Sequence, residues 1–265
     1  MAQEVGAFVR RDYLTWVSYR FAAFYQVLGV FAMVAFLYLL GETIGGDEPG
    51  FLDDETTGYA GFLLTSLAFI DIWSLGLFLP RSLRESQQTG TLEAMLLSHL
   101  SVVRLVLYSA AFPFLQSAAR LGIFAVFAIT VFGIWQSPDP IAVFAVLVVG
   151  MAVFMCIGLL SAAFILTLKQ GDPVLAVYGL VNMIFAGVFF PPDALPDWLR
   201  PFSALLPLTH ALEGMRQALG GANLADVATQ VIVLLGMFVV LMPFTVWALN
   251  WSVKRAKEEG SLVQY

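Results

Sequence analysis

Long apolar stretches are the feature of this sequence that most constrains its fold. Six windows carry at most one charged residue each: 21–40, 59–80, 106–134, 141–168, 174–190 and 226–251. About 20 apolar residues, rising about 1.5 Å each, are enough for a helix to cross the hydrocarbon core of a bilayer. The chain is 60% hydrophobic and 12% charged, whereas a soluble domain is about 45–50% apolar and about 25% charged. The sequence therefore predicts an all-α, polytopic membrane protein, with six transmembrane helices in one domain that spans residues 1–265.

The distribution of basic residues predicts the topology. With the N-terminus inside, ten of the thirteen Lys and Arg residues fall in cytoplasmic segments, and Arg200 and Arg216 fall outside. Arg120 lies within a span. An excess of Lys and Arg marks the cytoplasmic side of a membrane protein. We therefore expect a multi-pass protein of the cytoplasmic (inner) membrane with both termini in the cytoplasm.

Residues 4–20 and 191–221, which lie outside the spans, have helical character. Residues 4–20 place apolar side chains at 5, 9, 13, 16 and 17, a spacing typical of an amphipathic helix at the membrane interface. The alternative for this segment is a frayed basic tail. Residues 191–221 hold five prolines, too many for a continuous span, and contain short helical candidates at 194–199 and 208–219. An outer re-entrant helical hairpin is predicted there, because irregular backbone enters a membrane only where protein or water covers its polar groups.

Among the polar residues within the spans, Asp71, Arg120 and Asn182 are candidates for a functional role. Asp71 and Arg120 lie about 18 and 21 Å from the outer ends of their spans, so adjacent antiparallel helices would bring the two side chains together. An unpaired charge at that depth costs at least about 2.5–3.5 kcal/mol. The pair is either a structural ion pair or a polar lining that meets the charged head of a substrate. Asn182 is either a hydrogen-bonding residue between helices or a ligand contact.

The cytoplasmic segment 85–100 predicts a short amphipathic helix between the second and third spans. Gly90 permits a turn, Thr91 suits an N-cap, and Glu93 in the first turn favours the helix dipole. Leu92, Met95 and Leu96 then share one apolar face. Such a helix either inserts into a groove on a soluble partner or ties two spans together at the interface.

The sequence contains no recognisable nucleotide-binding, metal-binding or catalytic motif. No lysine follows a glycine, so the Gly-Lys-Ser/Thr of a phosphate-binding loop is absent. His99 and His210 are far apart and have no potential metal ligand at a suitable spacing, and no serine has a base at motif spacing. We expect no catalytic residue, no metal, no cofactor bound by this chain and no nucleic-acid partner.

Two spaced motifs resemble type-2 ATP-binding-cassette (ABC) permeases. The first is Glu85-Ser-Gln-Gln-Thr-Gly-Thr-Leu-Glu-Ala-Met-Leu. In that family, an acidic residue followed by Gly-Thr-Leu-Glu precedes the third span. The second block runs Gly187-Val-Phe-Phe-Pro-Pro, Leu195-Pro-Asp-Trp-Leu and Leu206-Pro-Leu-Thr-His-Ala-Leu-Glu-Gly-Met-Arg. With the six spans and the amphipathic start, the resemblance covers essentially the whole chain.

This resemblance implies the permease subunit of an exporter for an amphiphile: a drug, a lipid or a lipid-linked glycan. Two copies of a separate nucleotide-binding subunit would hold ATP and Mg, and a second permease copy or a paralogue would complete the path in the bilayer. The segment 85–100 would be the coupling helix, with contacts to that subunit from Glu85, Gly90, Thr91, Leu92, Glu93, Met95 and Leu96. The outer hairpin would cap the exit, with Phe189, Phe190, Pro191, Pro192 and Trp198 in the cap. The alternative is an ion-coupled secondary transporter that uses Asp71 and Arg120.

Overall fold

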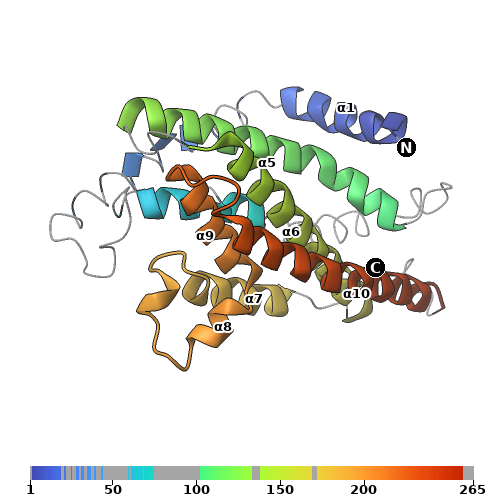
Figure 1. Cartoon of the computed structure of the whole chain (residues 1–265). Helices are drawn as coiled ribbons and strands as arrows, with labels where there is room; N and C mark the ends of the chain where they lie inside the picture. The colour runs from blue at the N-terminus through green and yellow to red at the C-terminus, as the bar shows by residue number, and fades with distance from the viewer. Residues whose placement is uncertain are drawn as a thin grey trace.

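The protein is a bundle of helices (Figure 1). The computed structural model describes residues 2–18, ten residues between 21 and 43, residue 59, and residues 61–67, 69–74, 102–132, 138–168 and 172–258. The labelled elements are α1 (Ala2–Ser18), α5 (Val102–Phe132), α6 (Pro140–Leu168), α7 (Asp172–Phe185), the 3₁₀ turn η1 (Pro192–Ala194), α8 (Arg200–Ala204), α9 (Pro207–Leu219) and α10 (Ala228–Glu258). A further helical stretch, Gly61–Ser74, is called helix 61–74 below. These described residues contain no strand.

Two of the described helices are long and apolar enough to cross a membrane: Pro140–Phe164 within α6 and Ala228–Ser252 within α10. Shorter apolar helices are Gly61–Ser74, Ala111–Val126 and Ala176–Phe185. These five fall in the second to sixth apolar windows of the sequence, and the described residues between 21 and 43 are helical. The all-helical architecture is confirmed for this part of the chain, whereas the number of six spans stays a prediction.

The fifth apolar window ends earlier as a helix than the sequence predicts. The expected boundary was 190, but α7 ends at Phe185, and residues 186–190 form a bend. Gly187 has φ +82°, a left-handed conformation that glycine adopts without the steric penalty of a Cβ. The helical candidate 194–199 is also wrong, because the short helix here is α8, over Arg200–Ala204.

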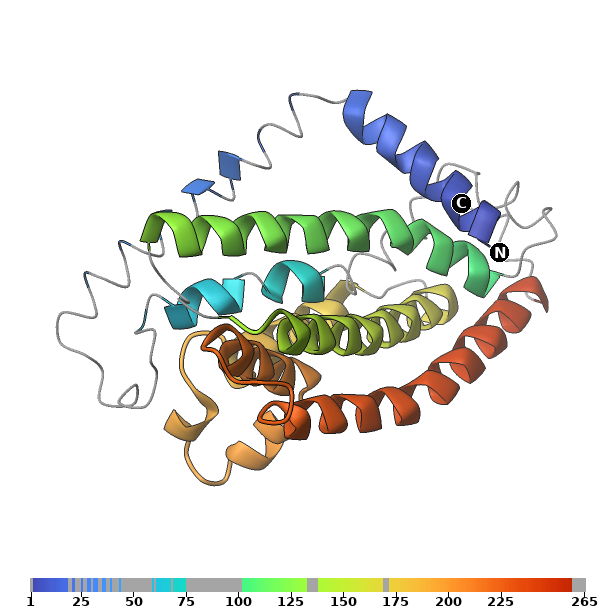
Figure 2. The same cartoon turned by 45° about the horizontal axis from the view of Figure 1, so that its top comes forward.

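Helix α9 lies between the N-terminal parts of α6 and α10. A Cβ on Gly214 of α9 would meet Val146 of α6 at 3.2 Å and Gln230 of α10 at 3.1 Å. Further along, α6 and α10 contact each other directly: Thr245 donates to the carbonyl of Cys156 (3.3 Å) and Ser252 to that of Ala163 (2.8 Å). The two helices therefore run in the same direction, as expected for spans separated by one intervening crossing. Figure 2 shows α10 curving around this core, and Pro243 interrupts its backbone hydrogen bonds.

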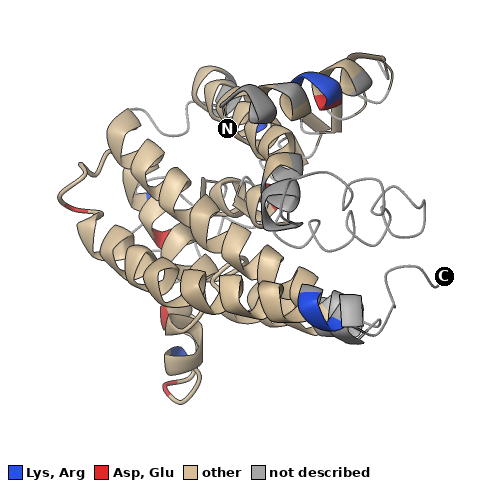
Figure 3. Ribbon diagram, turned by 90° about the vertical axis from the view of Figure 1, so that its right-hand side faces the viewer, with Lys and Arg blue, Asp and Glu red and all other residues tan. Residues whose placement is uncertain are grey.

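The outer faces of the long helices are apolar. Figure 3 shows them almost without charge along their length, with basic residues at the C-terminal end of α10. Val239, Val240, Phe244 and Trp247 of α10 are each more than half exposed. Side chains of this kind at such exposure are typical of a surface in contact with lipid or another apolar helix.

Helix α1 packs beside α5, as Figures 1 and 2 both show. The ring centroids of Phe8 and Tyr108 lie 5.9 Å apart, and those of Tyr13 and Phe112 lie 6.4 Å apart. The segment 4–20 is therefore helical up to Ser18, not a frayed tail.

Candidate functional site

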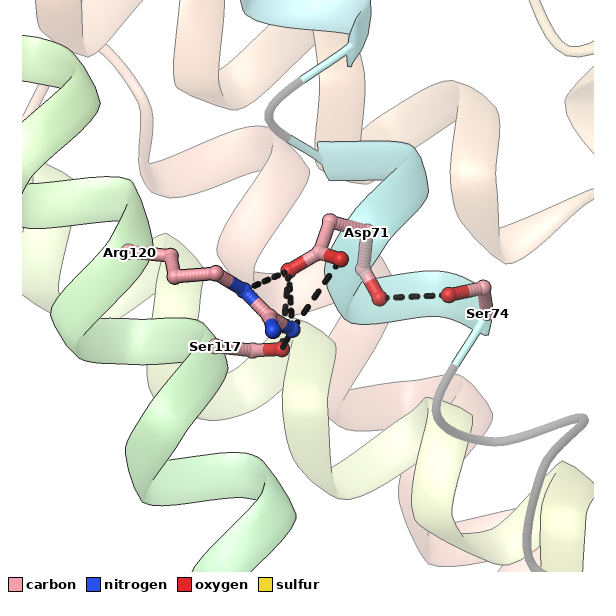
Figure 4. A network of polar contacts seen from close by, with 4 residues as sticks. All are labelled: Asp71, Ser74, Ser117 and Arg120. Atoms are coloured by element: carbon pink, nitrogen blue, oxygen red, sulfur yellow. Dashed lines mark hydrogen bonds and ion pairs between the residues drawn. The ribbon is translucent and has the colours of Figure 1, made fainter. Parts of the chain in front are cut away.

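An ion pair joins helix 61–74 to α5 (Figure 4). Nη2 of Arg120 lies 2.8 Å from Oδ2 and 3.1 Å from Oδ1 of Asp71, and Nε lies 3.1 Å from Oδ2. Ser117, one helical turn before Arg120, donates to Oδ2 of Asp71 (2.8 Å) and accepts a hydrogen bond from Arg120 (2.7 Å). The guanidinium thus donates to the carboxylate from two nitrogens, a bidentate geometry that makes Arg–carboxylate pairs strong.

The Asp71–Arg120 pair is only partly enclosed by this chain. The side chain of Arg120 is 21% exposed and that of Asp71 is 43% exposed. Ser74, one helical turn after Asp71, donates its hydroxyl hydrogen to the backbone carbonyl of Asp71 at 2.7 Å. One side of the pair is therefore accessible to a partner helix, lipid or substrate.

A second arginine, Arg216 of α9, connects three elements. Its Nη2 donates to Oγ of Ser66 (2.6 Å) on helix 61–74 and to the carbonyl of Gly187 (2.7 Å) in the bend after α7. Its guanidinium carbon lies 3.5 Å from the ring centroid of the fully buried Phe62, within the range of a cation–π contact. We call Arg216, Ser66, Gly187 and Phe62 the hairpin clamp, because together they hold the hairpin 191–221 against helix 61–74.

Two further contacts hold the bend at residues 186–190 in place. The hydroxyl of Tyr59 donates to the carbonyl of Phe189 at 3.3 Å. A Cβ on Gly187 would approach the ring of Pro192 to 3.1 Å, so glycine also fits the close contact there.

The predicted cap residues lie along the bend and the turn that follows. Phe189 and Trp198 are 50% and 71% exposed, whereas Phe190, Pro191 and Pro192 are partly buried. Arg200 fixes this turn by donating to the carbonyls of Asp193 (2.8 Å) and Leu195 (3.1 Å). The hairpin therefore presents aromatic side chains outward from a backbone held by two arginines.

Asn182 of α7 is fully buried but does not join the ion pair. Its amide nitrogen donates to the carbonyl of Tyr178 one turn earlier, at 2.9 Å. The Tyr178 ring in turn lies 6.1 Å from that of Trp73 on helix 61–74. The printed hydrogen bond of Asn182 thus lies within α7, and its role as a contact between helices or with a ligand stays a prediction.

The predicted coupling residues lie outside the described residues: Glu85, Gly90, Thr91, Leu92, Glu93, Met95 and Leu96. Within the part of the chain that is described, no cluster of three or more His, Cys, Asp or Glu residues is arranged to hold a metal.

The sequence missed the hairpin clamp. Arg216 counted only as one of two outer basic residues, and Ser66, Phe62 and Gly187 were not singled out as its partners. One signal was available: Arg216 closes the motif that starts at Leu206, and helical spacing places it on the same face as Leu208 and Leu212, which are buried.

Comparison with known proteins identifies the family. The model of the ABC-2 type transporter family matches residues 3–219, which is most of the 265-residue chain. A comparison with curated proteins returned no match. The matched range includes the ion pair, the hairpin clamp and both sequence motifs. The chain therefore belongs to the ABC-2 type transporter family and is the membrane-embedded permease subunit of an ABC transporter.

Proposed function

We propose that this permease is part of an ATP-driven exporter that moves an amphiphilic molecule, such as a drug, a lipid or a lipid-linked glycan, out of the cytoplasm. The family match over residues 3–219 is the observation that carries the proposal. The sequence has no phosphate-binding loop, so the proposal places ATP and Mg on two copies of a separate nucleotide-binding subunit. A second permease copy or a paralogue would form the other half of the translocation path.

In this proposal the segment 85–100 transmits the motion of the nucleotide-binding subunits. Its sequence combines a turn, a helix N-terminus and an apolar face on the side where basic residues collect. Both termini lie on that same cytoplasmic side, in the inner membrane. On the opposite side, the hairpin 191–221 covers the exit of the path, and its attachment to helix 61–74 through Arg216 supports this role.

Ion-coupled transport through Asp71 and Arg120 is not favoured by the family match. The geometry also suits a structural pair, because both groups bond to each other and to Ser117.

Copurification from native membranes tests the proposal. The tagged chain should bring down a nucleotide-binding subunit, identified by mass spectrometry, and the complex should hydrolyse ATP with sensitivity to vanadate. Glu85→Ala and Glu93→Ala should weaken this copurification or separate ATP hydrolysis from transport. Glu213→Ala changes an exposed glutamate of α9 on the proposed outer side and is the matched control. Normal coupled export by both cytoplasmic variants would contradict the coupling role, and a complex without an ATPase would contradict the proposed function.

A further inference from the structure

A cavity of about 660 Å³ lies below the start of α9, between α6, α7 and α10. Its walls on the two long helices are single stripes: positions 157, 160, 161 and 164 of α6, and positions 236, 237, 240 and 241 of α10. Its roof is Leu205, Leu206 and Pro207, where the hairpin turns into α9. The size falls within the roughly 300–1,000 Å³ typical of ligand pockets.

The position of α9 explains why protein leaves this space open. Between the N-terminal parts of α6 and α10, α9 fills the gap, with Gly214 against both helices. Helix α9 begins at Pro207, so this filling ends there. Beyond it, α6 and α10 meet along one side, at Cys156 and Thr245, while the side facing Tyr178 of α7 stays unfilled.

The lining offers almost no polar partner to a ligand. Ser161 donates its hydroxyl hydrogen to the carbonyl of Ile157, at 2.9 Å. The hydroxyl of Tyr178 is buried within the protein, so the lining is otherwise formed by aliphatic and aromatic carbon and by Met237. An apolar cavity of this kind does not hold ordered water.

The cavity also lies in the membrane-crossing part of both helices. Its stripes on α6 and α10 fall within Pro140–Phe164 and Ala228–Ser252, the two windows apolar enough to span a bilayer. Leu205, Val240 and Phe164 at its edge are 72%, 70% and 48% exposed. Its mouth is therefore continuous with the apolar outer face of α10, and the surrounding solvent at that level is lipid hydrocarbon.

We propose that this cavity binds an acyl chain of a bilayer phospholipid, which completes the packing between the base of the hairpin and the two long helices. The chain enters from the side, and its headgroup stays with the surrounding lipid. This inference depends on the protein being embedded in a membrane and not on ATP-driven export.

Gly236 allows a direct test, because a Cβ built there meets no atom within 4 Å. Gly236→Leu would place a branched side chain in the cavity and occupy part of its volume, and leucine is the better helix former. Gly122→Leu is the matched control: Gly122 is exposed in the interior of α5, and its Cβ also meets nothing within 4 Å.

The experiment uses the full chain in phosphatidylcholine vesicles that contain phosphatidylcholine with a photoreactive diazirine in the middle of an acyl chain. Labelled peptides are mapped by mass spectrometry, and Phe244 and Trp247 on the outer face of α10 are the internal reference for ordinary lipid contact. In the unchanged chain, label should concentrate on 157–164 and 236–241. Gly236→Leu should lower it there about tenfold, equivalent to a loss of about 1.4 kcal/mol in binding free energy, and Gly236→Ala should lower it less.

The controls decide the outcome. Gly122→Leu should leave labelling of the cavity unchanged, and the reference residues should be labelled equally in every variant. Equal cavity labelling in Gly236→Leu would overturn the proposal. Absence of label at the cavity in the unchanged chain would also overturn it, and would mean that protein, such as a second copy of the chain, covers this surface.

Discussion

Arg120 and Arg216 are held in different ways. Arg120 contacts a carboxylate and a serine, and joins helix 61–74 to α5. Arg216 contacts a hydroxyl, a backbone carbonyl and an aromatic ring, and joins helix 61–74 to the hairpin. Arg120 and Asp71 form a charge pair, so removal of either side chain leaves an unpaired charge in a low-dielectric environment. The contacts of Arg216 described above are instead with neutral groups, so its removal leaves no unpaired charge among them. We therefore expect the attachment of helix 61–74 to α5 to be more sensitive to substitution than its attachment to the hairpin.

The largest expected effect tests the charge pair. Arg120→Gln and Asp71→Asn each leave one charge without its partner, and each should lower the free energy of unfolding by about 2–4 kcal/mol. The double variant should lose less than the sum of the two, because neither charge then remains. Reversible unfolding in mixed micelles measures all three. Strict additivity in this double-mutant cycle would show that the pair has no coupling energy.

A smaller effect is expected at the hairpin clamp. Arg216→Gln removes the contact with Phe62 and the charge behind two hydrogen bonds, and should cost about 1–3 kcal/mol. Hydrogen exchange should increase at residues 186–190 and in α9, and much less in α5. Arg200→Gln is the control within the same hairpin, because its contacts are local: the carbonyls of Asp193 and Leu195, and an ion pair with Asp197 at 3.1 Å. If exchange in α5 rose as much as in α9, the clamp would not be a local attachment.

The smallest effect concerns the backbone on which the clamp rests. Gly187→Ala places a Cβ at φ +82° and 3.1 Å from Pro192, and should cost about 1–2 kcal/mol. Gly236→Ala, in an open helical position, should instead be neutral or stabilise by up to about 1 kcal/mol. Thermal unfolding of the two variants in one detergent compares them directly. Equal shifts in the unfolding temperature of the two variants would show that the left-handed conformation of Gly187 does not contribute to holding the hairpin.

The sequence predicted the charge contact better than the hairpin. Depth counting placed Asp71 and Arg120 at one level of adjacent helices, and the structure brings them together because a charge in a bilayer needs a partner. The same counting fails for Arg216, since depth cannot be counted along a chain that folds back. Its contact with Ser66 spans 150 residues, and no local pattern signals a pairing so distant.

The helix boundaries in the hairpin were predictable in part. Helices α8 and α9 both begin with a proline at one of the first two positions, where the missing N–H is harmless. The end of α9 at Leu219, before Gly220 and Gly221, agrees with the glycine stop in the sequence. The candidate 194–199 failed because it placed Pro196 inside a helix, whereas the short helix α8 begins at Arg200 with Pro201 at its second position.

The two hydrogen bonds of Arg216 also suggest an order of assembly during biosynthesis. The bond to Gly187 closes a loop of 29 residues, which becomes available as soon as residue 216 has been synthesised. The bond to Ser66 needs a helix made much earlier. A nascent chain can therefore complete the hairpin and dock it on helix 61–74 before α10 is synthesised. In that order, α10 is the last element to close over α9 and the core.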